Sequence, residues 1–216
     1  MSYAPLRLWA RMPDRVFRFV RDGIEPSLFD VHSMLRLPIA GVCEANCAFS
    51  IVMVLLNAVS GASTLLHEST GGAGQRFVKC LELFYPWHFA RFEDDVVGFA
   101  ASHIMYDVFR NPFAHSFGLE ITRPSTGMPV AKSRNVRKGV GRLQTPQTAA
   151  GIDEELLEEL ELAQKWPVWA GPTLEREPGG YKVNAEALYR GVRLMIERLC
   201  REPSQMAHAS RFLAGG

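Results

Sequence analysis

Residues 93–117, EDDVVGFAASHIMYDVFRNPFAHSF, join the clearest helical pattern of the chain to a short cluster of polar side chains. Acidic residues suited to a helix N-terminus open the stretch. Apolar residues then recur at the spacing of one helix face, at Val97, Ala100, Ala101, Ile104 and Val108. Aromatic side chains widen this stripe at Phe99, Tyr106 and Phe109. The pattern predicts a largely enclosed helix that runs directly into Arg110.

Pro112 limits how far this helix can continue. A proline disfavours the helical conformation in the residue before it and has no backbone N–H to donate. We therefore expect the helix to kink or restart at Asn111. On an unbroken helix Arg110 and His115 would point about 140° apart. Only a kink, or a second copy of the chain across a symmetric interface, would bring the two side chains to one point.

The residues at 110–115 offer a narrow chemistry. His115 can accept or donate a proton near neutral pH. Arg110 can bind a phosphate through two N–H groups of its planar guanidinium. Asn111 adds an amide that can hold a phosphate oxygen or orient the imidazole. This set suits the cleavage of RNA without a metal ion. The alternative is purely structural, with Arg110 paired to Asp107 one turn earlier and His115 a satisfied buried histidine.

The stretch R-N-P-F-A-H resembles the R-x4–6-H motif of the HEPN superfamily, and Arg110, Asn111 and His115 match that motif residue by residue. The resemblance implies a small helical bundle that dimerises and brings two motifs together in a cleft that cuts RNA without a metal ion or a nucleotide cofactor. It assigns acid–base work to His115 and the phosphate to Arg110, with Asn111 in support. It equally admits a catalytically silent module that binds RNA or protein in bacterial defence or stress response.

Phe117 departs from one branch of that superfamily. The toxins of this branch carry a tyrosine two residues after the histidine, and a partner enzyme modifies its hydroxyl. Phenylalanine has no hydroxyl, so this type of toxin–antitoxin regulation is not expected at this position.

The rest of the chain predicts a mainly α protein with short β-hairpin elaborations in its C-terminal half. We divide it into a HEPN-like helical bundle (1–120), a basic irregular arm (121–151), and C-terminal helices with a hairpin that pack on the bundle (152–216). One predicted helix opens at Pro13–Asp14 and ends at Gly23, and a second opens at Pro26. Three further helices are predicted over 45–59, 75–85 and 153–165. A hairpin is expected at Thr173–Val183, followed by a helix that Asn184 caps.

Net charge and cysteine spacing limit which partners and metal sites the sequence predicts. The formal net charge is +1, so a nucleic-acid partner requires a local patch. Five basic residues without an intervening acid form the candidate patch: Lys132, Arg134, Arg137, Lys138 and Arg142. A solvated basic loop explains the same residues equally well. The four cysteines lack the spacing of a zinc site and are expected as reduced thiols in a cytoplasmic protein. No metal, cofactor or membrane span is expected.

Overall fold

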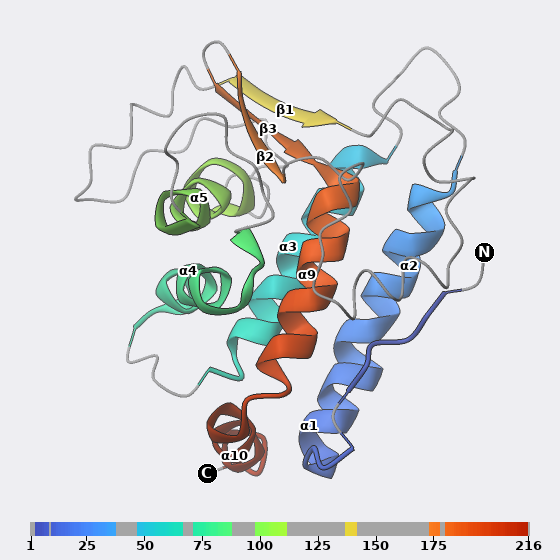
Figure 1. Cartoon of the computed structure of the whole chain (residues 1–216), viewed down its shortest axis with the longest axis vertical. Helices are drawn as coiled ribbons and strands as arrows, with labels where there is room; N and C mark the ends of the chain where they lie inside the picture. Colours follow the sequence, from blue (N-terminus) through green and yellow to red (C-terminus); the bar gives the residue numbers. More distant parts are fainter. Residues whose placement is uncertain are drawn as a thin grey trace.

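An uncharged helix, α3 (Ala48–Ser63), forms the centre of the structure. The computed structural model describes residues 3–8, 10–37, 47–66, 71–87, 98–111, 137–141, 173–177 and 180–215. Helices α2 (Glu25–Leu35), α4 (Ala73–Phe84) and α9 (Ala185–Leu199) pack against α3 (Figure 1). Ile51, Val52 and Leu55 of α3 are fully buried. The uncharged stretch is therefore the core helix that its sequence predicts.

The N-terminal helical region is continuous where the sequence predicts two helices. Helix α1 (Asp14–Arg18) passes through a π-helical turn, η1 (Phe19–Ile24), into α2 without leaving the helical conformation. The separation expected between Gly23 and Pro26 is therefore wrong. A buried stripe explains the continuity, because Val16, Val20, Ile24, Leu28 and Val31 all lie in the core. The π turn adjusts the backbone just before Pro26, which cannot donate a helical hydrogen bond.

Helix α4 carries a second helical layer. It packs on α3 with Phe77 and Leu81, which are almost completely buried. Helix α5 (Gly98–Ile104) packs on α4 and continues into a second π-helical turn, η3 (Met105–Arg110). In Figure 1, α4 and α5 lie together on one side of α3 and α9, opposite α1 and α2. This layer positions Arg110 and Asn111, the last two described residues of this segment.

A small sheet covers one end of the helices, in the order β1–β3–β2 (Figure 1). Strands β2 (Leu174–Glu177) and β3 (Gly180–Asn184) pair antiparallel, which confirms the predicted hairpin. Strand β1 (Arg137–Gly141) pairs parallel with β3, with Arg137 in register with Gly180. This parallel pair was not expected, since the sequence shows no strand–helix alternation and residues 121–151 predict only an irregular arm with a local hairpin. A single short strand that joins a distant hairpin leaves no local pattern.

Helix α9 begins as predicted. The side-chain oxygen of Asn184 accepts a hydrogen bond from the backbone N–H of Ala187 at 3.0 Å, and this satisfies one of the free donors at the helix start. The chain then turns into α10 (Pro203–Phe212), whose Met206 and Ala209 are buried. The structure is mainly α with a short β-hairpin, as expected. Among the described residues, no helix is long and apolar enough to cross a membrane.

Candidate functional site

Arg110 is the last residue of η3, and the buried face of this turn fixes its backbone. Met105 and Phe109 are fully buried and Val108 is nearly so, which anchors the turn to the core. Asn111 stays helical, with φ −65° and ψ −49°. The π-helical irregularity lies one turn before Asn111, and the expected kink or restart at Asn111 stays a prediction because the residues after it lie outside the described part of the chain.

The π turn explains why Arg110 does not pair with Asp107. On an α-helix, residues three apart are neighbours on one face. A π-helical turn bonds each residue to the fifth along, so each residue rotates through less than the α-helical angle and Arg110 moves off the Asp107 face. Both residues are described, and no ion pair joins them. This removes the structural explanation of Arg110 as a partner of Asp107.

Two contacts hold the Arg110 side chain instead. Its Nε donates a hydrogen bond to the Oγ of Ser60 on α3 at 3.3 Å, and its guanidinium lies 5.8 Å from the centre of the Tyr106 ring. Ser60 in turn donates its hydroxyl proton to the Leu56 carbonyl at 3.0 Å. The hydroxyl is thus oriented so that a lone pair faces Arg110.

Tyr106 is itself fixed from α4. Its ring lies 5.5 Å from the ring of Phe77, centre to centre. It also fits over Gly74, where a Cβ would collide with the phenol group. The ring beneath Arg110 is therefore held by two residues of a neighbouring helix. Nε is engaged and the ring supports one face, and among the described residues the two terminal nitrogens of the half-buried guanidinium have no hydrogen-bond partner, so they can bind another ligand.

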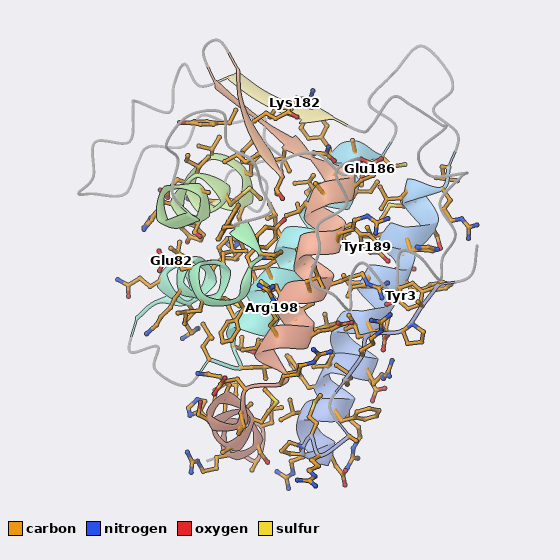
Figure 2. All side chains as sticks on the ribbon, viewed as in Figure 1. Tyr3, Glu82, Lys182, Glu186, Tyr189 and Arg198 are labelled. Atoms are coloured by element: carbon orange, nitrogen blue, oxygen red, sulfur yellow. The ribbon has the colours of Figure 1, made fainter. Side chains whose placement is uncertain are left out.

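Two titratable side chains, His103 and Asp107, lie one to two turns before Arg110, and a third, Glu82, faces them from α4. His103 Nε2 is 3.9 Å from Oε1 of Glu82, which Figure 2 labels on α4. Burial raises the pKa of Asp107, and the nearby charge of His103 partly opposes this rise. This group belongs to the α4–α5 contact. It does not meet Arg110, so it gives that arginine no counter-ion.

The other predicted site residues divide into two groups. Asn111 follows Arg110 directly and is half-buried. Arg137 and Lys138 have their backbones in β1, an edge strand of the sheet. The remaining ones lie outside the described residues: His115, Lys132, Arg134 and Arg142. The structure brings together Arg110 and Asn111 and does not test the rest of the set.

Ser60 and Tyr106 are the contacts that sequence reasoning missed. Ser60 had a visible signal, because it is a polar residue in an apolar helix. The sequence gives no signal that Tyr106 contacts Arg110, because an aromatic residue at this position also fits the apolar stripe of the helix.

The cysteines show no metal-binding arrangement in the described part of the chain, where no group of three or more His, Cys, Asp or Glu side chains converges. Cys80 and Cys200 are buried free thiols, and Cys47 is an exposed one. Burial raises the pKa of both Cys80 and Cys200 to about 12, so neither is a reactive nucleophile. Cys43 lies outside the described residues.

Comparison of the chain with protein-family models, curated proteins and solved structures found no match in any of the three. The resemblance to the HEPN superfamily therefore rests on the motif at 110–115, together with its place after an enclosed helix.

Proposed function

We propose that the chain is a metal-independent endoribonuclease of the HEPN type, with its active site in a cleft between two copies. Arg110, Asn111 and His115 of each copy line that cleft. The basic residues bind the RNA backbone outside it: Lys132, Arg134, Arg137, Lys138 and Arg142.

In this proposal the two His115 side chains move the protons of the attacking 2′-hydroxyl and of the leaving 5′-oxygen. One imidazole takes the proton of the 2′-hydroxyl, whose oxygen attacks the adjacent phosphorus. The bond from phosphorus to the 5′-oxygen breaks, and that oxygen takes a proton from the imidazolium of the other copy. The products are a 2′,3′-cyclic phosphate and a 5′-hydroxyl.

Arg110 stabilises the charge that grows on the non-bridging phosphate oxygens. A guanidinium does this best when two N–H groups point at two oxygens in a fixed fork. Asn111 supplies a further donor from the next position. The observation that carries the proposal is the placement of Arg110. Ser60 holds its Nε, Tyr106 supports its face, and the π turn separates it from Asp107.

The same placement supports a site on general grounds. Single π turns within α-helices occur frequently at functional positions. An arginine that is half-buried yet has no carboxylate partner among the described residues is suited to an external anion.

The test is cleavage of single-stranded RNA in the presence of a chelator. We expect Arg110→Ala and His115→Ala to lower the rate by on the order of 10²-fold or more, because each removes a group that acts only in the transition state. Arg110→Lys should also lose most activity, since lysine keeps the positive charge but lacks the pair of parallel guanidinium N–H donors. Asp107→Asn is the matched control on the same turn and should cleave like the wild type.

Circular dichroism and size-exclusion chromatography establish that each variant keeps its fold and oligomeric state. A wild-type chain that cuts no RNA with the chelator present would overturn the endoribonuclease proposal. If that chain still binds RNA and Arg110→Ala weakens binding, the site belongs to a catalytically silent RNA-binding module.

A further inference from the structure

The end of the molecule formed by α1 and α10 carries exposed arginines. The two helices pack against each other and lie together at the lower end of the molecule in Figure 1. Arg15 and Arg18 are three residues apart on α1, so they lie on one face of that helix. The Arg15 guanidinium also donates a hydrogen bond to the Leu213 carbonyl, at the end of α10, at 3.5 Å. The arginine cluster is defined as Arg11, Arg15, Arg18 and Arg211, which are all exposed.

The arginine cluster has no carboxylate partner in the described part of the chain, where none of its four guanidinium groups forms an ion pair. Two acids lie close by along the chain, but each is placed at a helix start. Asp14 is in the first turn of α1, and Glu202 is the N-cap residue of α10. Acids at these positions interact with the partial positive charge of the helix N-terminus. The cluster therefore presents positive charge that the described residues do not neutralise.

Two exposed aromatic rings lie on the same two helices. Phe17 on α1 is 41% exposed, and Phe212 on α10 is 55% exposed. The Arg21 guanidinium lies 5.4 Å from the centre of the Phe17 ring. The His208 ring stacks on Phe212, with 6.5 Å between the ring centres. Single-stranded nucleic acids bind to surfaces of this composition, because cations hold the phosphates and bases stack on exposed rings.

We propose that the arginine cluster binds the backbone of single-stranded RNA at a surface separate from the cleavage site. The identity of this polymer rests on the proposed ribonuclease function. Arginine suits the task, because a planar guanidinium binds a phosphate through two N–H groups and also stacks on bases. A membrane surface fits less well, since a helix that lies in a membrane interface needs a broad apolar face. Phe212 is the one large apolar side chain that α10 exposes.

The arginine cluster and the cleavage site lie on different parts of the molecule. In Figure 1, α5, which leads into η3 and Arg110, lies higher along the longest axis than α1 and α10. An RNA that occupies both surfaces must therefore be long. A short RNA can enter the cleavage site without contacting the arginine cluster, so the two surfaces can be tested separately.

The first experiment measures RNA binding by the full chain. Fluorescence anisotropy uses a single-stranded RNA of about 40 nucleotides, longer than the roughly 4–16 nucleotides that one single-strand site covers. The triple variant Arg15→Gln, Arg18→Gln, Arg211→Gln removes three phosphate contacts. We expect its plot of log affinity against log salt concentration to be shallower than that of the wild type by about 2. Its affinity at about 0.1 M salt should be lower on the order of 10²-fold.

A second triple variant is the matched control. Arg36→Gln, Lys79→Gln, Lys182→Gln removes the same charge from α2, α4 and β3, and it should bind RNA like the wild type. Glutamine is a good helix former, and the replaced arginines of the cluster are exposed, so both variants should keep the wild-type circular dichroism spectrum. Equal salt slopes for the two triple variants would overturn the arginine cluster as an RNA-binding surface.

Cleavage kinetics separate this proposal from the proposed function. The cluster variant should raise KM for the long RNA by a similar factor and leave kcat unchanged, and it should cut an RNA of about six nucleotides like the wild type. An unchanged KM for the long RNA would refute the arginine cluster and leave the ribonuclease standing. A wild type that cuts no RNA, but whose binding depends on the cluster, would refute the ribonuclease alone.

Vesicles of phosphatidylcholine and phosphatidylserine test the membrane alternative. We expect the wild-type chain to remain in the supernatant when these vesicles are sedimented. Sedimentation of the wild type but not of the cluster variant, together with equal RNA affinity of the two chains, would assign the arginine cluster to an anionic membrane and overturn the RNA proposal.

Discussion

Ser60 is the residue that links the core helix to Arg110. Its hydroxyl accepts from Arg110 Nε and donates to the Leu56 carbonyl, so it serves two partners at once. Three residues along, Ser63 donates its hydroxyl proton to the Ser60 carbonyl, and among the described residues it is Ser60 that accepts from Arg110 Nε. Both serines lie on α3 and donate their hydroxyl protons to a backbone carbonyl of that helix, but Ser60 is the one that accepts a hydrogen bond from Arg110.

This difference yields a matched pair of variants. We expect Ser60→Ala to lower RNA cleavage by on the order of tenfold, because Arg110 loses a hydrogen bond to a charged group and with it a fixed orientation. Ser63→Ala should leave the cleavage rate unchanged. Initial rates with the chelator, at saturating RNA, provide the measurement. Equal rates for the two variants would show that Ser60 does not position Arg110.

At the residue scale the sequence singles out Arg110 and Asn111 as candidates, but it does not predict the side chains that surround Arg110. A motif states which residue types occur at which spacing, and that information is local. The pairing of Arg110 with Asp107 fails because a helical wheel assumes α-helical rotation, whereas the π turn changes it. Ser60 is fifty positions away in the chain, and only the packing of η3 on α3 brings it to Arg110.

At the scale of elements, the contact between α9 and the chain after α4 depends on one glycine. Tyr85 donates or accepts a hydrogen bond with Thr173 at 2.7 Å, and its phenol fits directly against Gly191 in α9. A Cβ at Gly191 would overlap the phenol group. Because Tyr85 is buried and bonded, it has little room to move.

Two glycine-to-alanine changes test this packing. Alanine normally stabilises a helix interior relative to glycine by about 1 kcal/mol. At Gly61 of α3 the nearest atom to a new Cβ is 4.0 Å away, so Gly61→Ala should raise the free energy of unfolding by roughly 0.5–1 kcal/mol. Gly191→Ala should lower it by about 1–3 kcal/mol through overpacking. Urea denaturation measures both, and a stabilising Gly191→Ala would contradict the described packing.

Element prediction succeeds where one buried face dominates the pattern. Helices α3, α4 and α9 lie where their apolar stripes and the Asn184 cap predict them. The prediction of two separate N-terminal helices fails because Gly23 and Pro26 normally interrupt a helix, whereas here one stripe of buried apolar residues spans both positions. Strand β1 was not predicted because its partner strand lies about forty residues away in the chain, and such long-range pairing leaves no local sequence pattern.

At the scale of the whole molecule, the core holds two thiols and a phenol whose ionisation opposes folding. Cys80 Sγ lies 3.9 Å from Met195 Sδ between α4 and α9, and Cys200 ends α9. Burial raises the pKa of each thiol from 9.0 to about 12. Burial also raises the pKa of Tyr85, partly opposed by its bond to Thr173. All three groups resist ionisation in the folded chain.

We therefore expect stability to fall at alkaline pH. Above pH 9 the unfolded thiols lose protons while the folded ones keep them, so the unfolded state binds fewer protons and the free energy of unfolding decreases as pH rises towards 12. Each thiol contributes on the order of 1 kcal/mol per pH unit in this window.

Urea denaturation at a series of pH values measures this slope. The double variant Cys80→Ala, Cys200→Ala is the control. The cavities it creates lower stability at every pH, but its alkaline slope should be shallower than that of the wild type. Identical slopes would show that the thiols are not protected in the folded chain.

The central claim is that Arg110, Asn111 and His115 cut RNA without a metal ion, and the ends of the cleavage products test it most directly. In the chelator-treated reactions, mass spectrometry of a short RNA oligonucleotide should show fragments with 2′,3′-cyclic phosphate and 5′-hydroxyl ends from the wild type and none from His115→Ala. Fragments with 5′-phosphate ends, or the same fragments from the wild type and His115→Ala, would contradict the account.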